Sequence, residues 1–411
     1  MTFRAVADTP IAGTVYAEGW QSWSPMRLYR AGEAGDRAAG DREQVVAFRP
    51  GRPVPEGVIQ GEGILAVAPP DGPARAWYSP QPAFEVATLR LARNRDRLEL
   101  TADGQVEEVE AAGLDAALAA VGDRLGTGRV RSIPAGWCSW SYYFQGVTER
   151  DVVENVESAL RLGLPIDIAQ LDDGYETSIG DWLDVRERFG SLQRLAGRIG
   201  AAGMQPGIWL APFLVAPSST LAKLHPDWLL AENTAGLHWG EEMRILDVTR
   251  APAAEHLSGV FRTLAGWGFG YFKLDFLYAA AIPGLEAYRR GMELIREAVG
   301  PDAILLACGA PLLPSIGLCD AMRIGPDILQ ETADPQLDLD SVVRITQLRR
   351  WMTGRLWVND PDCLVARPQI EDREAWAAHL ERYGGLRFSS DRLSALDERG
   401  LELTRRVLAS G

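Results

Sequence analysis

The chain has 411 residues, of which 46% are hydrophobic and 24% charged, so it is long enough to bury a large core. Its formal net charge of −14 disfavours polyphosphate partners, and no basic run with interleaved aromatic residues suggests binding of nucleic acid. No stretch approaches the roughly 20 apolar residues of a membrane span, and the first residues lack the apolar core of a signal peptide, so we expect a soluble cytoplasmic protein.

Residues 1–128 are predicted to form a small β-rich domain. Short β-prone runs are separated by Gly, Pro and Asp residues that favour turns: 44–48, 63–70, 84–92 and 97–104. The run LDAALAAVGDRLG at 114–126 has the pattern of a helix and would connect this domain to the rest of the chain.

Residues 129–411 show a different pattern, in which short apolar runs alternate with amphipathic helical stretches. The apolar runs lie at 135–141, 166–174, 205–212, 270–276, 303–309, 320–327, 355–362 and 385–391. The first helical stretch opens at Thr148 with an acid three residues later, which is the signature of a capping box. Eight strand–helix units in about 260 residues predict an α/β fold of the (β/α)8 TIM barrel type. A doubly wound open sheet is the alternative, but no Gly-rich phosphate loop follows the first run.

Charged residues, Trp or Cys stand at the C-terminal ends of nearly all these runs: Trp140, Asp172, Asp173, Trp209, Asp275, Cys308, Asp327 and Asp360. In a barrel these ends converge on one face, which is where active sites lie. Residues with a purely structural role would be scattered along the strands. The sequence therefore predicts a shared polar pocket, into which both Lys273 and Asp275 of the run YFKLDF project.

The composition leaves few chemistries open for this pocket. The four cysteines lack a CxxC spacing and there are only four histidines, so we expect no metal and no other cofactor. Enzymes that hydrolyse glycosides typically use two carboxyl groups that face each other across the glycosidic bond. Asp275 is the better candidate nucleophile, because Lys273 lies on the same face of the strand and a nearby cation holds a carboxylate ionised. For the proton donor, the residues alone leave four acids open: Asp320, Asp327, Asp360 and Asp362.

Seven motifs follow one another between residues 133 and 395: GWCSWSYYF, LDDGYE…GDW, GIWLAP, YFKLDF, RIGPD, WVNDPD and GLRFSSDRL. In this order they resemble the motifs of glycoside hydrolase family 36, the melibiase-type α-galactosidases, whose barrel motifs are shared with family 27. One such motif would be weak, but seven in sequence are specific.

The resemblance implies a role for each matched residue. Asp275 would be the nucleophile and Asp327 the acid/base of a retaining exo-glycosidase that hydrolyses terminal α-galactosides by double displacement. Asp172 and Asp173 would accept hydrogen bonds from the 4- and 6-hydroxyls, Lys273 would bind the 3- and 4-hydroxyls, Arg323 and Cys308 would line the 2-hydroxyl, and Trp140 and Trp209 would pack against the ring. For Cys308, core packing is an equally good interpretation, because buried free cysteines are common.

Other functions on the same scaffold are an α-N-acetylgalactosaminidase and a galactosyl-transferring enzyme. A carbohydrate-binding or sensor protein on a degenerate barrel is disfavoured, because both Asp275 and Asp327 are present. The expected partner is a small oligosaccharide or galactoside, not nucleic acid or a membrane, and a homo-oligomer is left open.

Several features depart from the family pattern. We expect neither the large N-terminal β-supersandwich nor the C-terminal β domain of typical members, and we expect residues 211–268 to form a subdomain beside the barrel mouth. In the first domain, GWQSWSP at 19–25 echoes GWCSWSY at 136–142. Trp20 and Trp23 are expected to fill the core of the small domain; the alternative is that one of them contacts the sugar or aglycone.

Overall fold

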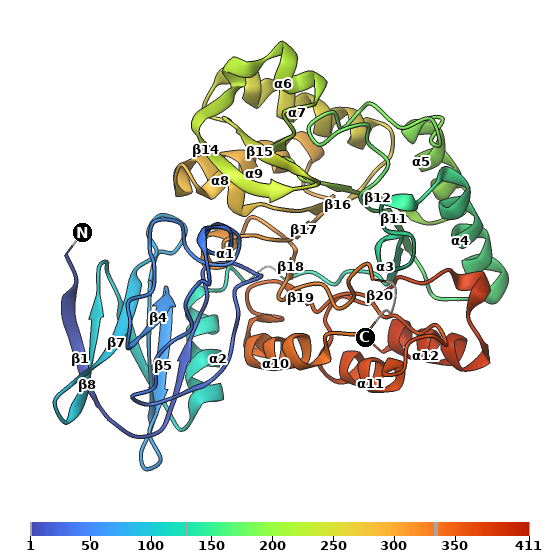
Figure 1. Ribbon diagram of the computed structural model, residues 1–411. Helices are drawn as coiled ribbons and strands as arrows, with labels where there is room; N and C mark the ends of the chain where they lie inside the picture. The colour runs from blue at the N-terminus through green and yellow to red at the C-terminus, as the bar shows by residue number, and fades with distance from the viewer. Residues whose placement is uncertain (1, 129, 333–335, 411) are drawn as a thin grey trace.

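Figure 1 shows the computed structural model of the chain, in which a β-rich N-terminal part lies beside a larger α/β part. The structure describes residues 2–128, 130–332 and 336–410. The predicted division between residues 128 and 129 falls at a residue outside this described set. Within the described residues, no helix has both the length and the apolar character needed to cross a bilayer.

The N-terminal part contains two antiparallel sheets, with the strand orders β1–β8–β7–β4 and β3–β2–β5–β6–β9. Their strands are β1 (Arg4–Pro10), β2 (Thr14–Ala17), β3 (Tyr29–Arg30), β4 (Val58–Glu62), β5 (Ile64–Ala68), β6 (Ala74–Tyr78), β7 (Thr88–Asn94), β8 (Arg97–Ala102) and β9 (Glu107–Ala111). Apolar residues alternate with polar ones along strands such as β8. The apolar faces of the two sheets pack together in one core, which includes Leu65, Trp77, Leu89 and Leu100.

The predicted strands at 63–70, 84–92 and 97–104 are confirmed as β5, β7 and β8, and the predicted helix is α2 (Leu114–Leu125). The strand prediction for residues 44–48 is wrong, because most of this run belongs to α1 (Asp41–Val46). Asp41 and Glu43 in the first turn favour a helix start, and Val45 and Val46 pack against the large hydrophobic core instead of pairing with a strand.

The larger part is built on one eight-stranded parallel sheet, consistent with a TIM barrel, in the order β19–β18–β17–β16–β12–β11–β10–β20. Its strands are β10 (Gly136–Cys138), β11 (Ile168–Leu171), β12 (Gln205–Leu210), β16 (Tyr271–Leu274), β17 (Ile304–Ala307), β18 (Ala321–Arg323), β19 (Val358–Asp360) and β20 (Phe388–Ser389). Each lies within one predicted run. Where β19 and β20 meet, Leu386 N donates to Asn359 O at 2.8 Å, and Leu364 forms a parallel bridge with Ser389.

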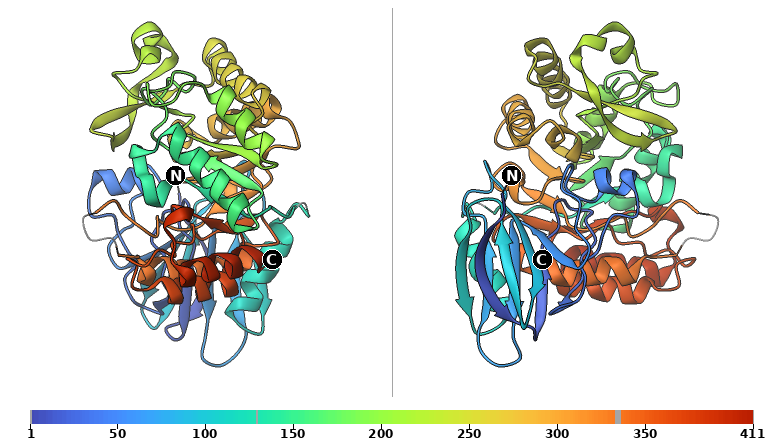
Figure 2. Two further views of the ribbon diagram at one scale, coloured as in Figure 1. Left: turned by 90° about the vertical axis from the view of Figure 1, so that its right-hand side faces the viewer. Right: turned by 60° about the vertical axis from the view of Figure 1, so that its left-hand side comes forward.

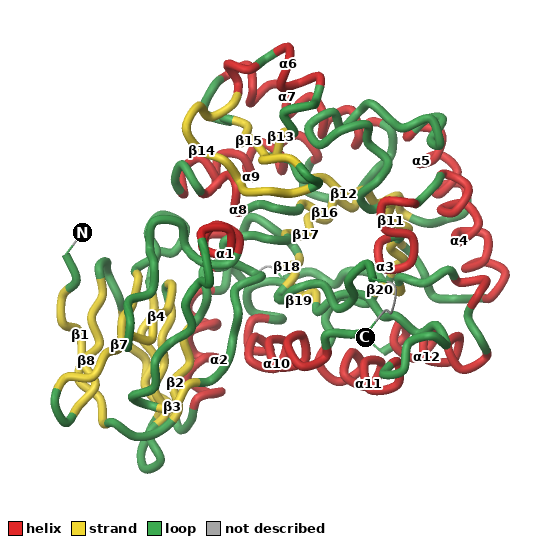
Figure 3. The backbone as a smooth tube through the Cα atoms, in the orientation of Figure 1, coloured by secondary structure: helices red, strands yellow, loops and turns green. Residues whose placement is uncertain are grey.

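Helices surround this sheet on its outer side, as Figure 3 shows by colour. They include α4 (Glu149–Leu162), α5 (Leu192–Ala201), α7 (Ala251–Gly266), α9 (Leu285–Val299), α10 (Leu339–Arg349), α11 (Arg373–Tyr383) and α12 (Glu398–Ala409). The predicted capping box is present at the start of α4: the Thr148 side chain accepts from Asp151 N, and the Asp151 side chain accepts from Thr148 N.

The connection between β12 and β16 forms the expected subdomain. Strands β13 (Leu214–Val215), β15 (Glu241–Leu246) and β14 (Leu229–His238) make a small antiparallel sheet, accompanied by α6 (Thr220–Leu224). Figure 2 shows this subdomain rising beside the parallel sheet, on the same side as α1 of the N-terminal part. The turn between β14 and β15 therefore lies close to the carboxyl ends of the barrel strands.

The N-terminal part meets the barrel through residues 18–24. Gln21 forms an antiparallel bridge with Pro311, and Ser22 N donates to Ala310 O at 3.0 Å. Because residues 310 and 311 follow β17, these contacts hold Trp23 against the carboxyl end of the parallel sheet.

Candidate active site

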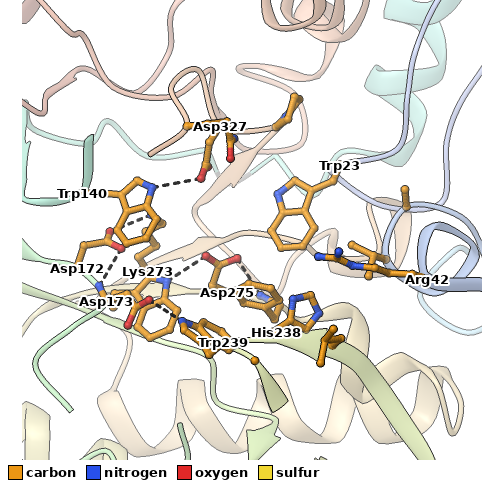
Figure 4. A pocket seen from close by; sticks show the side chains of 18 residues that line it. Trp23, Arg42, Trp140, Asp172, Asp173, His238, Trp239, Lys273, Asp275 and Asp327 are labelled. Carbon is orange, nitrogen blue, oxygen red and sulfur yellow. Dashed lines mark hydrogen bonds and ion pairs between the residues drawn. The ribbon is translucent and has the colours of Figure 1, made fainter. Parts of the chain in front are cut away.

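A cavity of about 700 Å³ opens at the carboxyl ends of the parallel strands (Figure 4). Seven of the predicted site residues line it: Trp140, Asp172, Asp173, Trp209, Lys273, Asp275 and Asp327. The other two, Cys308 and Arg323, are buried and do not line the cavity. The prediction that the unusual strand-end residues share one pocket is therefore confirmed for most of them.

Asp172 follows β11 and Lys273 lies in β16, and the two form a buried ion pair although β12 separates their strands. Lys273 Nζ lies 2.9 Å from Asp172 Oδ2, which also accepts from Gln170 Nε2 at 2.7 Å. Burial opposes the charge of Lys273, but the Asp172 carboxylate more than compensates, so the pKa of Lys273 lies well above its usual value. Lys273 therefore stays charged at neutral pH.

Asp275 follows β16 and is 8% exposed. Its Oδ2 accepts from Trp209 Nε1 at 3.0 Å, and its Oδ1 accepts from the Phe276 amide at 2.8 Å. Burial raises the pKa of Asp275, while the positive charge of Lys273 and hydrogen bonds from Trp209 and Cys308 oppose this rise.

The expectation that Lys273 holds Asp275 ionised needs correction. Lys273 does favour the ionised form of Asp275, but its direct partner is Asp172. Spacing along one strand places Lys273 and Asp275 on the same face. The ion pair instead depends on which carboxylate from another strand reaches the ammonium group, and Asp172 follows β11, which β12 separates from β16. The desolvation of Asp275 outweighs the remaining attraction to Lys273.

Asp327 lies across the cavity from Asp275 (Figure 4) and its side chain is 33% exposed. Its Oδ1 accepts from Arg323 Nη1 at 2.8 Å, and its Oδ2 accepts from Trp140 Nε1 at 3.2 Å. Asp327 therefore lies in a charged setting, because the Arg323 guanidinium, four residues earlier in the chain, turns toward it. The two cavity carboxylates still differ clearly, one being buried and the other partly open to solvent.

The other acids that the sequence leaves open as proton donors are placed elsewhere. Asp360 and Asp362 are bound by Arg323 at 3.0 and 2.8 Å, and neither lines the cavity. Asp320 precedes β18 and pairs with Arg296 at 2.7 Å, at the opposite end of that strand from Asp327. Of the four acids, only Asp327 reaches the cavity.

Asp173 is held from two sides. Its Oδ2 accepts from Gln145 Nε2 and from Trp239 Nε1, each at 2.9 Å. Trp239 lies in the turn between β14 and β15 and has a φ of +49°, a conformation that non-glycine residues rarely adopt. The subdomain thus contributes directly to the position of a predicted sugar-binding acid.

Aromatic rings form the walls of the cavity. Trp209 packs edge-on against Trp239, with ring centroids 6.2 Å apart, and Trp23 packs edge-on against Phe276 at 5.1 Å. Trp20 is 5% exposed and lies in the core, as expected, but Trp23 lines the cavity, so the core prediction is wrong for Trp23. The local motif is alike around both residues, and only the contact with the barrel separates them.

Some cavity residues were missed by the sequence reasoning: Arg42, His238, Trp239, Phe276 and Gln330. Arg42 lies in α1, two residues before the run that was predicted to be a strand. His238 is the last residue of β14, and Trp239 follows it in the turn to β15. Burial lowers the pKa of His238 to about 4, so this imidazole is neutral near pH 7. The sequence signal for this part of the cavity was the adjacent pair His238 and Trp239 in the long connection between β12 and β16, and such a pair is only weak evidence of a site.

The arrangement combines two carboxylates in unlike settings with a set of fixed hydrogen-bonding groups and aromatic walls. Two carboxylates that flank a cavity of this size are able to perform acid–base and nucleophilic chemistry on a sugar. Among the described residues, no group of three or more His, Cys, Asp and Glu side chains is placed to hold a metal ion.

Comparison with known proteins gives a consistent result. Residues 136–285 match the Melibiase family. The chain is 29% identical over 159 residues to the α-galactosidase AgaA of Geobacillus stearothermophilus, a match that covers 36% of this chain and 22% of AgaA. It is 27% identical over 123 residues to an α-galactosidase of Escherichia coli, covering 28% of this chain and 17% of that protein. The chain thus matches only about a fifth of the length of these curated relatives.

Solved structures match over almost the whole chain. TtGalA, an α-galactosidase from Thermus thermophilus in complex with p-nitrophenyl α-D-galactopyranoside, is 28% identical with a TM-score of 0.82, and the match covers 99% of this chain and 89% of TtGalA. AgaA from Geobacillus stearothermophilus, described as a GH36 α-galactosidase, shares the fold with a TM-score of 0.69 at 14% identity, covering 98% of this chain and 61% of AgaA.

Proposed function

Because this chain is a relative of the melibiase-type α-galactosidases of glycoside hydrolase family 36, we propose that it is a retaining exo-glycosidase that hydrolyses terminal α-galactosides. The observation that carries the proposal is the placement of Asp275 and Asp327 on opposite sides of one cavity at the carboxyl ends of the parallel strands. This is the arrangement that double displacement at a glycosidic bond requires.

In the proposed mechanism, Asp327 donates a proton to the glycosidic oxygen while Asp275 attacks the anomeric carbon. The bond to the aglycone breaks and a covalent β-galactosyl ester of Asp275 forms. Asp327 then takes a proton from water, which attacks the same carbon and releases galactose with the α configuration retained. The hydrogen bonds from Trp209 and Phe276 to Asp275 would hold the attacking carboxylate in one orientation.

The sugar-binding groups are proposed to divide into direct and indirect ones. Asp172, Asp173 and Lys273 line the cavity and would bind hydroxyl groups of galactose, while Trp140 and Trp209 would pack against its ring. Cys308 and Arg323 lie behind the cavity wall and contact Asp275 and Asp327, respectively. We therefore propose that they hold these two carboxyl groups and do not bind the 2-hydroxyl. Trp23 and Arg42 line the cavity from the N-terminal part and would face the aglycone.

Other statements about the whole protein stay predictions. They are the division into residues 1–128 and 129–411, the cytoplasmic location, and an oligosaccharide as the natural substrate. A second structure of TtGalA is a complex with stachyose, an oligosaccharide, which supports the substrate class by analogy.

The test is a screen of nitrophenyl α-glycosides that includes the galactoside, the N-acetylgalactosaminide and the glucoside. We expect the galactoside to be hydrolysed fastest, with the α anomer of galactose as the first product in proton NMR. First release of the β anomer would contradict retention, and faster turnover of the N-acetylgalactosaminide or the glucoside would contradict the substrate.

A further inference from the structure

Glu176 is a buried carboxyl group that the mechanism above does not use. It is 2% exposed and lies in the connection that follows β11, where its backbone forms an isolated bridge with Val185. Its Oε2 accepts a hydrogen bond from the Gly174 amide at 3.2 Å. A carboxyl group this deeply buried requires a partner, because desolvation of the charged form is costly.

The two oxygens of Asp173 differ in their surroundings. Oδ2 accepts from Gln145 and Trp239, as described above, whereas Oδ1 is buried and receives no hydrogen bond from any N–H or hydroxyl donor among the described residues. The carboxyl group of Glu176 lies within hydrogen-bonding reach of the Asp173 carboxyl. Two ionised carboxylates have no proton to share, so a hydrogen bond between them requires that one be protonated.

We propose that Glu176 is protonated in the working protein and donates its O–H to Asp173 Oδ1. Glu176 is then a positioning residue: it fixes the Asp173 carboxylate so that Oδ2 faces the sugar. The protonation state follows from the cluster itself, whereas the effect on sugar binding rests on the proposed function.

The charges around Glu176 support this assignment of the proton. Burial raises the pKa of Glu176 well above its ordinary value, and the negative charge of Asp173 raises it further. Arg186 donates to the backbone carbonyl of Glu176, at 2.8 Å, and Arg188 donates to the Gly174 carbonyl. Glu241 of β15, which lines a small cavity beside Glu176, has Ser218 as its partner.

No cation in the described part of the chain forms an ion pair with the Glu176 carboxyl group. The nearby Asp172 carboxylate is already paired with Lys273. The cluster of Asp173 and Glu176 therefore holds a single negative charge, located on the acid that lines the cavity. Ionisation of Glu176 would place two carboxylates in contact and push Asp173 out of position.

The first experiment reads the proton directly and needs no substrate. Infrared difference spectra at pH 7 compare the wild type with Glu176→Gln in the carbonyl-stretch region of protonated carboxyl groups. We expect a protonated-carboxyl band in the wild type that is lost in Glu176→Gln. The matched control is Glu187→Gln, an exposed glutamate in the same connection, which should leave this band unchanged.

The second experiment measures the affinity for galactose by calorimetry across pH 6 to 10. Glu176→Gln keeps a donor for Asp173 Oδ1 in its amide, so it should bind galactose within about twofold of the wild type at pH 7. Glu176→Ala should bind roughly tenfold more weakly, the loss expected when a buried acceptor is left unsatisfied. Wild-type affinity should fall as Glu176 ionises at high pH, while that of Glu176→Gln should not.

Each result has a defined meaning. Absence of the band change, or equal weakening of galactose binding by Glu176→Gln and Glu176→Ala, would overturn the proposed proton on Glu176. If the wild type does not bind galactose at all but the band change is present, the proposed function fails and the protonated pair stands. Circular dichroism of Glu176→Ala separates loss of positioning from loss of the fold.

Discussion

Two fully buried arginines, Arg349 and Arg323, differ in how their hydrogen bonds are used. Arg349 donates to Glu18 Oε1 at 2.7 and 3.0 Å and to the carbonyl oxygens of Ser22 and Ile324, each at 2.7 Å. Every one of these acceptors is itself buried in the contact between the N-terminal part and the barrel. Arg349 and Glu18 therefore form a structural ion pair that connects the N-terminal part to the barrel, and we call this pair the clasp.

Arg323 binds three carboxylates, and one of them, Asp327, reaches the cavity and is partly exposed. A guanidinium whose acceptors are all internal connects two pieces of the fold, whereas one that holds a carboxylate at a cavity wall orients a group for a ligand. Both guanidinium groups are buried, but Arg349 pairs with one carboxylate and Arg323 with three. The presence of one acceptor with access to the cavity distinguishes the Arg323 cluster from the Arg349 cluster, and it is the reason why we propose a role in function for the former.

The largest effect is expected from the cavity cluster. Asp275→Ala should reduce turnover of every substrate by roughly four orders of magnitude or more, because no group replaces the nucleophile. Asp327→Ala should retain more activity on nitrophenyl galactosides, whose leaving group departs without a proton. Azide should give the α-galactosyl azide with Asp327→Ala and the β anomer with Asp275→Ala, which NMR of the products distinguishes. Equal activity of Asp275→Ala and the wild type would remove Asp275 from the mechanism.

Substitutions in the clasp of Glu18 and Arg349 should change the stability of the protein and not its catalytic chemistry. Arg349→Met leaves Glu18 buried without a counter-charge, so we expect the free energy of unfolding to fall by about 3–5 kcal/mol, measured by denaturant titration. The double variant Glu18→Gln/Arg349→Met should recover part of this loss, because it removes the unpaired charge. A stable Arg349→Met protein with lost activity would show that the clasp belongs to the active site.

Lys273→Ala tests whether the Asp172 pair is structural or catalytic. Lys273 favours the ionised form of Asp275, so its removal should raise the pKa of Asp275 further. The nucleophile must be ionised, and the acidic limb of the pH profile of kcat/KM should therefore move to higher pH. Circular dichroism monitors the fold, because unfolding of this variant would indicate a structural ion pair like that of Arg349.

Asp173→Asn should weaken galactoside turnover by an amount equivalent to about 1–3 kcal/mol, since the carboxylate proposed to accept a hydrogen bond from a sugar hydroxyl is lost. Asp184→Asn, an exposed acid in the same connection, provides the control. Asp172→Asn should also lower activity, but with lower stability, because Lys273 would remain buried without its partner. Full activity of both Asp172→Asn and Asp173→Asn would contradict their assignment to the sugar.

The smallest effect is expected at Trp23, which is only partly buried and packs on Phe276. Trp23→Ala should raise KM for an oligosaccharide severalfold while changing kcat little, because the ring would contact the aglycone and not the reacting atoms. Trp20→Ala should instead lower the melting temperature with little change in KM, as expected of a core residue. The reverse pattern would exchange the roles of the two tryptophans.

The order of strands and the polar strand ends could be predicted from the sequence because both depend on local pattern. Each barrel strand is a short apolar run, and parallel strands bring their carboxyl ends together whatever the details of packing. Asp275 and Asp327 could therefore be placed in one pocket before any contact was known. The helix at residues 41–46 could not, because its valines pack against a distant core and not against a neighbouring strand.

The sequence by itself determined the alternation of strands and helices, the capping box of α4 and the positions of the acids along the chain. The tertiary structure decided which donor each acid received: Lys273 for Asp172, Arg323 for Asp327, and Trp239 from the subdomain for Asp173. It also decided that Trp23 and Trp20, in one short motif, have different roles. The reason is that backbone pattern is governed by neighbours along the chain, whereas ion pairs and cavity walls depend on side chains from elements far apart in sequence.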